Sequence, residues 1–262
     1  MIVVKAGGRV IDKGFNSLVK SVAKYSGKAI MVHGGGDQVT AYCKRLGIEP
    51  VFVTSPQGIR SRYTTKEELE VYVMVMNFIN KRLVLGLSSL GKKALGISGV
   101  DSSTIIAERK KRIVILDERG KKRIIEGGYT GKVTAVAADT LSALSSLVDV
   151  LVVSPIALDP SEGILLNVDG DQTAFAVSSA LRVEILILLT DVPGVLIENE
   201  VVGRLSVSEA KELAQKIGPG MNRKLLMAAE AVEKGVGKVI ISSGLTEDPI
   251  GDALAERGTV VK

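Results

Sequence analysis

The sequence has few of the residues that metal centres and disulfide frameworks require. Its 262 residues include one cysteine, Cys43, and one histidine, His33. One cysteine cannot form an intramolecular disulfide, and one histidine beside it leaves no Cys/His cluster for zinc. These counts exclude a disulfide-stapled domain and a zinc-bound fold, and they are typical of a cytoplasmic protein.

Aromatic residues and long hydrophobic runs are also scarce. Aromatic side chains make up 3% of the chain, which is few for the stacking platforms of a single-strand binder, and we find no helix-turn-helix spacing. Apolar runs such as 185–189 have the length of a strand, far below the roughly 18 to 20 residues that span a bilayer. The chain begins directly in a predicted strand, so we expect no signal peptide. Neither a nucleic acid nor a membrane is expected as a partner.

Glycine and positive charge are what the chain has in excess. The formal net charge is +5 and the pI is about 9.2, which favours an acidic protein or a phosphorylated small molecule as a partner. The predicted strand 29–32 runs into Gly34, Gly35 and Gly36, and a helical pattern follows. Glycines between a strand and a helix let backbone N–H groups approach an anion closely.

A second stretch repeats this arrangement and adds a cation. The predicted strand 2–5 ends with Lys5 and runs into Gly7 and Gly8. A tight turn between strand and helix explains one such glycine run equally well. Two parallel strands that bring glycines and one ammonium group to the same sheet edge predict a phosphate site.

The order of the apolar runs predicts an α/β fold with a mostly parallel sheet covered by helices on both faces. Two lobes that share one sheet are expected, with hairpins at about 113–125 and 195–205 and an excursion over 50–64. The basic runs 109–112 and 121–123 are interpreted as solvated surface. The predicted strands are 2–5, 29–32, 149–153, 164–166, 185–189, 238–242 and one near Thr259, and the predicted helices are about 14–24, 38–46, 65–89, 171–181, 207–217 and 221–234.

Three later segments place polar groups at predicted strand ends or helix starts. Asn167 to Asp171 lies between a strand and a helix, where capping explains one carboxylate better than two. Thr190 to Gly194 ends an apolar strand, and an ordinary turn is the alternative. Gly218 to Lys224 opens a helix with two cations in its first turn, where the helix dipole disfavours them by about 0.3–1 kcal/mol each. These cations suggest an anion nearby, although so small a penalty is also tolerable without one.

Two better-known motifs are excluded. The GxxxxGK string from Gly86 to Lys92 has Lys93 where a P-loop needs Ser or Thr. A calcium loop counted from Asn167 has Gln172 in place of its glycine and Ser178 in place of its glutamate.

Taken in order, the motifs resemble those of the amino acid kinase family, and within it the N-acetylglutamate kinase group, over essentially the whole chain. The resemblance implies a three-layer αβα sandwich with a mainly parallel open sheet. It implies an N-terminal lobe, 1–166, for acid-substrate and carrier binding and dimerisation, and a C-terminal lobe, 167–262, for ATP. The matching motifs are Lys5-Ala6-Gly7-Gly8, His33-Gly34-Gly35-Gly36, Ser61-Arg62-Tyr63-Thr64, Asn167-Val168-Asp169-Gly170-Asp171, Thr190-Asp191-Val192-Pro193-Gly194 and Met221-Asn222-Arg223-Lys224.

The same resemblance implies roles for individual residues. Lys5 and Lys224 would contact the transferring phosphoryl group, and Asp171 would position these lysines. ATP and Mg²⁺ are the implied cofactors, with the metal carried on the ATP phosphates rather than in a protein site. The implied substrate-binding residues are Gly34, Gly35, Arg62 and Asn167, and the implied nucleotide-binding residues are Gly7, Gly8, Thr190, Asp191, Gly194 and Met221.

Within the family, two strings resemble the kinases that act on aminoadipate or glutamate tethered to a small acidic carrier protein of the LysW type. These strings are 61–64 and 127–132; kinases of free N-acetylglutamate usually have Arg-Val-Thr-Asp at the first. Thr65 stands where both groups generally have Asp. The chain starts in its first strand, without the N-terminal helix of the arginine-inhibited hexamers, so a homodimer is expected.

The resemblance therefore implies a kinase that makes an acyl phosphate in lysine and arginine biosynthesis. Three alternatives stay open. One is a kinase of free N-acetylglutamate, another is a kinase of carbamate, aspartate or a nucleoside monophosphate, and the third is a non-catalytic nucleotide-binding regulator.

Overall fold

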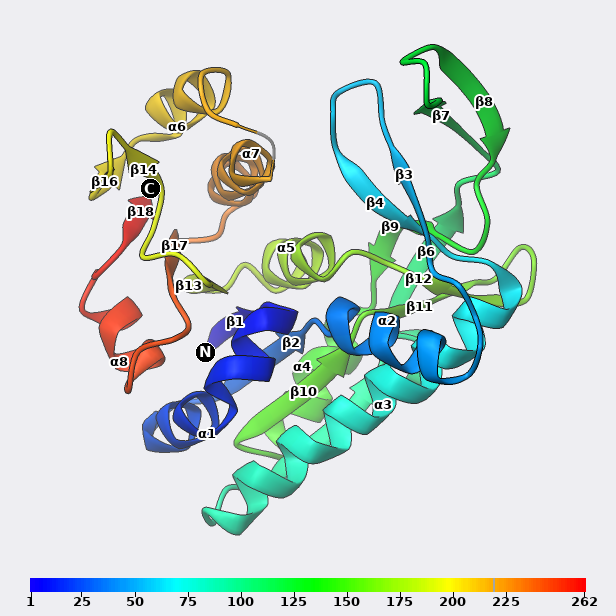
Figure 1. Cartoon of the computed structure of the whole chain (residues 1–262). Coiled ribbons are helices and arrows are strands. Elements are labelled where there is room, and N and C mark those ends of the chain that lie inside the picture. The colour runs from blue at the N-terminus through cyan, green and yellow to red at the C-terminus, as the bar shows by residue number, and fades with distance from the viewer. Residues whose placement is uncertain (219) are drawn as a thin grey trace.

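The computed structural model describes residues 1–218 and 220–262, and in it two helical layers enclose one large sheet (Figure 1). The helices are α1 (Gly8–Lys24), α2 (Gly36–Arg45), α3 (Lys66–Ser89), α4 (Ala138–Ser146), α5 (Gly170–Leu181), α6 (Val207–Ala214), α7 (Met221–Glu233) and α8 (Pro249–Leu254), with a short 3₁₀ turn, η1 (Asp101–Ser103). The strands are β1 (Ile2–Ala6), β2 (Ala29–His33), β3 (Val51–Thr54), β4 (Arg60–Tyr63), β5 (Ala94–Ser98), β6 (Ile105–Arg109), β7 (Arg112–Leu116), β8 (Lys122–Glu126), β9 (Gly131–Val136), β10 (Val150–Ser154), β11 (Ile156–Asp159), β12 (Ile164–Asn167), β13 (Ile185–Thr190), β14 (Leu196–Ile197), β15 (Glu200–Val201), β16 (Arg204–Leu205), β17 (Lys238–Ser243) and β18 (Thr259–Val261).

The main sheet is mostly parallel, as the sequence predicts. In the described residues its order is β16-β18-β17-β13-β1-β2-β10-β5, and β17 and β18 form its antiparallel pair. In the register of the central strands, Lys5 lies opposite Val32 on β2 and Leu188 on β13. The carboxyl ends of β1, β2 and β13 therefore meet at one edge of the sheet.

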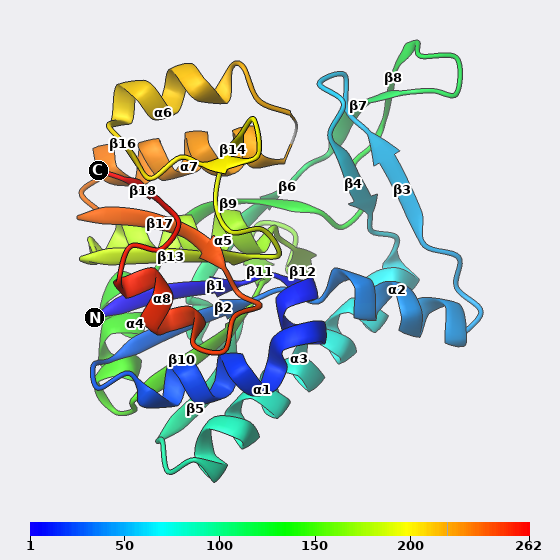
Figure 2. The same ribbon diagram turned by 60° about the vertical axis from the view of Figure 1, so that its left-hand side comes forward.

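Alternating apolar residues in the strands build two separate cores. Ile2 and Val4 on β1 pack toward α1, α3 and α8, whereas Val3 packs toward α4, α5, α6 and α7. Successive side chains of a strand point to opposite faces, so a strand that is apolar throughout needs helices on both sides. Figure 2 shows α6 and α7 on one side of the sheet and α1 and α3 on the other. Lys5 follows Val3 by two residues and so lies on the α5 side.

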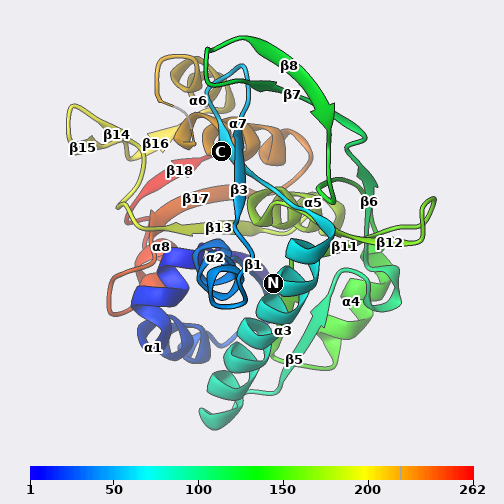
Figure 3. The same ribbon diagram turned by 45° about the vertical axis from the view of Figure 1, so that its right-hand side comes forward.

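Two smaller four-stranded sheets accompany the main one. Their orders are β12-β11-β6-β9 and β4-β3-β7-β8. The second consists of hairpin β3–β4 and the predicted hairpin β7–β8, and both extend beyond the main sheet in Figure 2. In Figure 3, β7 and β8 lie at the top of the molecule, above β6. None of the described helices is both long and apolar enough to cross a bilayer.

The predicted helix 14–24 is wrong at its start. Helix α1 begins at Gly8, directly after the glycine turn, and Gly14 interrupts it with non-helical torsion angles (φ −119°, ψ 20°). The first turns are fixed by buried Val10 and Ile11. Tertiary packing therefore overrides the glycine that marks a boundary in the sequence.

The other differences concern short elements. The predicted elements do not include β5, β6, β9, β11, α4 or α8, and the predicted excursion over 50–64 contains the strands β3 and β4. Arg204–Leu205 was assigned to a hairpin, whereas these residues pair with β18. Strand β9 has no strict alternation of buried and exposed residues. Helix α8 has six residues and is defined by Pro249 in its first turn and the Asp248 cap, too short for a periodic signal.

Asn80 links α3 to the sheet and supplies a stability prediction. Its buried side-chain amide donates to the carbonyl oxygens of Ile97 and Val152, each at 3.1 Å. Replacing Asn80 by Ala should lower the free energy of unfolding by about 3 kcal/mol, because two buried carbonyl groups lose their donor and a cavity remains. Urea denaturation measures this loss. Asn77→Ala, on the same helix but half-buried, should change stability by about 0.5 kcal/mol or less. Equal effects would contradict this account.

Candidate active site

One carboxylate joins two lysines from opposite ends of the chain. Lys5 on β1 lies with its Nζ 2.8 Å from Asp171 Oδ1, and Lys224 Nζ donates to Asp171 Oδ2. Asp171 stands in the first turn of α5 and Lys224 in the first turn of α7. The side chains of Lys5, Asp171 and Lys224 are 12%, 16% and 20% exposed, respectively. Two lysines that would repel each other are thus held side by side in a partly dry site.

The pKa values follow from this arrangement. Burial acts to lower the pKa of Lys5, but the charge and hydrogen bond of Asp171 outweigh it and raise that pKa above its ordinary value. Burial acts to raise the pKa of Asp171, and the charges of Lys5 and Lys224 outweigh it and hold that pKa well below its usual range. The carboxylate therefore stays ionised at neutral pH beside two ammonium groups.

The two glycine turns press against each other beside the lysines. The Gly34 N–H donates to Ala6 O at 2.8 Å. A Cβ on Gly34 would lie 2.9 Å from the Gly8 nitrogen, and one on Gly35 would lie 2.3 Å from Ile79 Cδ1. At Gly34 the obstruction is backbone, which leaves no room for a side chain, whereas at Gly35 it is the end of the Ile79 side chain, which would have to shift. The turns also start α1 and α2 without a side-chain cap, which leaves N–H groups and positive helix ends at this edge.

A cleft of about 370 Å³ runs along these turns. Among the described residues, five cationic side chains and one carboxylate, Asp169, line this cleft. Such a surface attracts anions and concentrates their field in a narrow space. The cations are Lys5, Arg60, Arg62, Lys110 and Arg223.

Arg62 is fixed in this cleft by a buried network. Its guanidinium donates to Glu68 Oε1, to Gly36 O at 2.8 Å and to Thr40 Oγ1 at 2.5 Å. Glu68 is 1% exposed. Thr65 caps α3 by accepting a hydrogen bond from Glu68 N, which ties Glu68 into the first turn of the helix.

Asn167, the last residue of β12, lines the cleft as Arg62 does. Its Nδ2 donates to Thr64 Oγ1 at 2.9 Å, and Thr64 is fully buried. Six of the predicted site residues line the cleft: Lys5, Gly8, Gly34, Gly35, Arg62 and Asn167. Gly7 precedes Gly8 in the same turn. Asp171 and Lys224 do not line the cleft, but Asp171 contacts the cleft residue Lys5, and Lys224 contacts Asp171.

The other predicted nucleotide-side residues lie outside this cleft. Thr190 donates to Asp191, which is paired with Arg9 at 2.9 Å, and hydrogen bonding to Arg9 lowers the pKa of Asp191. Gly194 packs against Thr259, where a Cβ would come within 2.9 Å of the hydroxyl. Met221 packs on the core at the start of α7. Pro219, part of the motif that precedes Met221, lies outside the described residues.

Lys110 lines the cleft although it was not among the predicted site residues. The basic run 109–112 was interpreted as solvated surface, and for Lys110 that interpretation is incomplete because this residue lines the cleft. Partial burial lowers the pKa of Lys110, and the charge of Arg223 lowers it further against the opposing effect of Asp169. The sequence shows that the run 109–112 is basic, but the conformation of the turn between β6 and β7 decides which of its residues faces the cleft.

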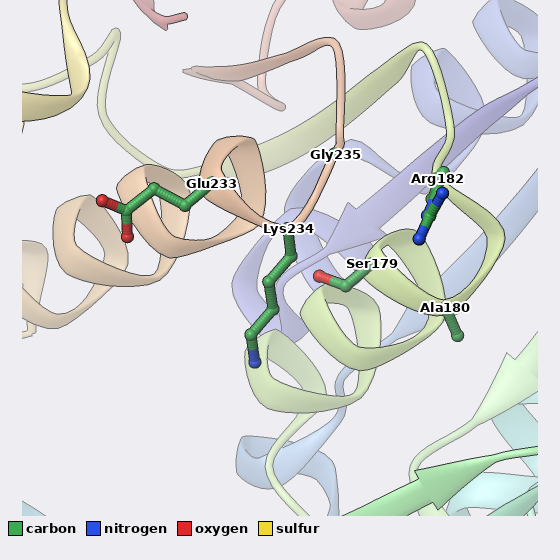
Figure 4. Close-up of a pocket in the computed structure, with 6 residues that line it drawn as sticks. All are labelled: Ser179, Ala180, Arg182, Glu233, Lys234 and Gly235. Carbon is green, nitrogen blue, oxygen red and sulfur yellow. The ribbon is translucent and has the colours of Figure 1, made fainter.

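A larger depression, of about 900 Å³, lies at the opposite end of α5 (Figure 4). It contains Ser179 and Arg182 from the end of α5 and Glu233 and Lys234 from the end of α7. Both helices direct their carboxyl ends here, and that end of a helix dipole disfavours an anion. The smaller cleft is therefore the better candidate for phosphate chemistry.

Sequence comparisons identify the family of the chain's relatives. A model of the amino acid kinase family matches residues 1–243. A LysW-aminoadipate/LysW-glutamate kinase of Saccharolobus solfataricus is 64% identical over 261 residues, which cover 100% of this chain and 99% of that protein. A protein of the same description from Metallosphaera sedula is 63% identical over 261 residues, which cover 100% of this chain and 100% of that protein.

Solved structures share the fold at low identity. Carbamate kinase from Giardia lamblia bound to AMP-PNP superposes with a TM-score of 0.69 at 14% identity, covering 99% of this chain and 97% of that one. N-acetylglutamate synthase from Neisseria gonorrhoeae has a TM-score of 0.79 at 19% identity, covering 99% of this chain and 58% of that one. These likenesses confirm the predicted fold class.

His33 is the last residue of β2, directly before Gly34, and its burial predicts how the stability of the protein depends on pH. Its Nδ1 contacts Gly34 O at 3.1 Å and must carry the proton, because a carbonyl only accepts, while Nε2 lies 3.0 Å from Ser154 Oγ. Burial lowers the pKa of His33 to about 4. The unfolded chain takes up this proton near pH 6.5, so stability should fall by about 3 kcal/mol as pH drops from 6.5 to 4.

An NMR titration of this single histidine measures the pKa directly. A His33→Gln variant should lose the part of the pH dependence that lies between pH 6.5 and 5, above the range of most carboxylates. A resonance that titrates near pH 6.5 in the folded protein would contradict the prediction.

Proposed function

The chain belongs to the amino acid kinase family, and on that premise we propose that it phosphorylates the side-chain carboxylate of 2-aminoadipate or glutamate held on a LysW-type carrier protein. ATP is the phosphoryl donor and the product is an acyl phosphate. One observation supports the phosphoryl transfer above all: Lys5 and Lys224 both contact Asp171, and this cluster lies beside two glycine turns. The substrate rests on relatives that are 62–64% identical over their full length.

The chemistry requires positioning rather than proton transfer. A glutamate side-chain carboxyl group in water has a pKa of about 4.3, so it is an ionised nucleophile at pH 7. Its oxygen attacks the γ-phosphorus, the bond from that phosphorus to the β–γ bridging oxygen breaks, and ADP leaves with the electron pair. Catalysis then consists of holding two anions in line and neutralising the oxygens of the transferring group.

The proposed roles follow the positions of the side chains. Lys5 and Lys224 contact the phosphoryl oxygens, and Asp171 keeps both ammonium groups in place. The N–H groups of Gly8 and Gly35 receive the γ-phosphate, whereas the Gly34 N–H donates to Ala6 O and Gly34 serves by allowing the close approach of the two turns. Arg62 and Asn167 bind the region of the α-carboxylate, with Arg62 held rigid by Glu68 and Thr40.

The adenosine part of ATP is proposed to lie on the C-terminal lobe, 167–262, with the acid substrate on 1–166. Gly7, Thr190, Asp191, Gly194 and Met221 would form the nucleotide side of the site. Magnesium would neutralise charge on the ATP phosphates. The described residues hold no cluster of three His, Cys, Asp or Glu side chains suited to a metal, and both Asp171 oxygens already contact lysines, which supports a metal carried by the nucleotide.

The partners proposed are the carrier and a second copy of this chain. The exposed basic run 121–123 and the net charge of +5 suit an acidic carrier, since complementary potentials speed encounter. For the homodimer, Met74, Phe78 and Leu85 form an exposed apolar stripe on α3, at 57%, 51% and 70% exposure. As a biosynthetic kinase, the protein is expected to work in the cytoplasm.

Substrate preference tests the proposed function. A hydroxamate assay, which traps acyl phosphates, should detect ATP-dependent product with carrier-bound aminoadipate, carrier-bound glutamate or both. Free N-acetylglutamate should give negligible product at the same concentration. The reverse preference would identify a kinase of the free acetylated substrate.

Removal of one lysine tests the mechanism. Lys224→Ala should reduce kcat by about 10²–10³-fold or more, because a charge that stabilises the transition state is lost. The exposed Lys216 is a matched control, and Lys216→Ala should leave kcat within about twofold. Circular dichroism establishes that both variants are folded. Unchanged turnover in Lys224→Ala would remove this lysine from the mechanism.

A further inference from the structure

A buried hydrogen-bond network lies behind the second glycine turn. His33 is fully buried, and its Nδ1 donates to Gly34 O at 3.1 Å. Its Nε2 lies 3.0 Å from the Oγ of Ser154, the last residue of β10, which is also fully buried. Because Nδ1 carries the only proton of the neutral ring, Nε2 accepts and the Ser154 hydroxyl donates. The other contact of this hydroxyl, with Met76 O, is longer at 3.4 Å. The imidazole is thus fixed in one tautomer and one orientation.

The bond from the imidazole to Gly34 O decides where the next N–H points. Gly34 O and the Gly35 N–H belong to one peptide group, and in a trans peptide the two bonds point in opposite directions. The described residues contain no cis peptide bond. Since the Gly34 carbonyl is directed at the buried ring, the Gly35 N–H is directed away from it, on the side of the cleft that Gly35 lines.

The groups on either side of this peptide are also held. The Gly34 N–H donates to Ala6 O at 2.8 Å, and Gly35 O accepts from Val39 N at 3.0 Å. A Cβ on Gly8 would lie 3.2 Å from the Gly35 nitrogen, so this nitrogen lies against the first glycine turn. The Gly34 carbonyl, between these fixed points, is the group that the imidazole holds.

We propose that His33 is a positioning residue for phosphoryl transfer, which holds the Gly34 carbonyl inward and thereby keeps the Gly35 N–H aimed at the oxygens of the transferring group. This inference rests on the proposed function, which places the γ-phosphate at this N–H. A donor that is oriented before the reaction stabilises developing charge without having to reorganise. His33 itself touches neither the nucleotide nor the acid, and it acts through one peptide group.

Two neutral replacements of His33 separate positioning from packing. In His33→Asn the side-chain amide nitrogen takes the place of Nδ1 and donates to Gly34 O. In His33→Gln the amide nitrogen reaches the place of Nε2 instead, which leaves the Gly34 carbonyl without its donor.

The kinetic constants of the two variants should therefore differ. His33→Gln should reduce kcat by about 10- to 100-fold, less than the full loss of a donor because the N–H is misdirected rather than removed. The KM values for ATP and for the carrier adduct should stay within about threefold, since the affected interaction strengthens in the transition state. His33→Asn should keep kcat within about threefold, although its smaller side chain leaves a cavity and lowers stability more. A histidine that only fills the core would give the reverse order.

Asn80→Ala is the control for lost stability. Asn80 is buried and bonds to two carbonyl groups of the same core, but it does not line the cleft. At a temperature where circular dichroism shows the variant to be folded, it should keep kcat within about twofold, because stability and turnover are then separate quantities.

The amide resonance of Gly35 supplies a readout apart from activity. In the unmodified protein the Gly35 amide proton should shift downfield when AMP-PNP and Mg²⁺ are added and should move less with ADP and Mg²⁺, because only AMP-PNP carries a γ-phosphate. The shift should persist in His33→Asn and be lost in His33→Gln.

Three outcomes would overturn the inference and leave the proposed function standing. They are equal kcat values in the two His33 variants, a loss of kcat in Asn80→Ala as large as that in His33→Gln, and a Gly35 shift that survives in His33→Gln. Failure of the unmodified enzyme to phosphorylate the carrier adduct would overturn the proposed substrate, and the Gly35 resonance would still decide the role of His33.

Discussion

The sharing of one carboxylate by two lysines is the interaction on which the site depends. Lys5 lies on the central strand and Lys224 at the start of the penultimate helix, and without Asp171 between them their like charges would repel each other. The ion pairs survive partial burial because each Asp171 oxygen has its own ammonium partner. What remains is a net positive, preorganised surface, which is the electrostatic requirement for phosphoryl transfer.

The parallel sheet places this interaction where ligands can reach it. Strands β1, β2 and β13 are buried on both faces and held in a fixed register, so their carboxyl ends form one rigid edge. Glycine turns at that edge then bring backbone N–H groups where side chains would not fit. Strand β4, which carries Arg60 and Arg62, belongs to a smaller sheet outside the main one, and Lys110 lies in the turn between β6 and β7. These three cations therefore reach the cleft from outside the main sheet.

The long, strongly patterned elements were predictable and the short ones were not. The predictions matched strands 29–32 and 185–189 and helix 65–89 within about two residues, because an apolar run or a helical period extends over each. Helix α1 was placed six residues late because Gly14 resembles a boundary, and α8 and β9 were missed because six residues carry too little periodicity. Lys110 could be recognised as basic, but the turn that points it inward depends on the pairing of β6 with β9 and of β7 with β8.

By itself the sequence determined the fold class, the glycine turns and the set of charged residues, since these follow from local pattern and from motifs in a fixed order. Only the tertiary structure decided which of those residues meet. It joined Lys5 and Lys224 through Asp171, buried Glu68 behind Arg62 and kept Thr190, Asp191, Gly194 and Met221 outside the cleft. The physical reason is that spacing along the chain fixes neighbours within a helix or strand, whereas contacts between distant segments depend on sheet register and on how helices pack against it.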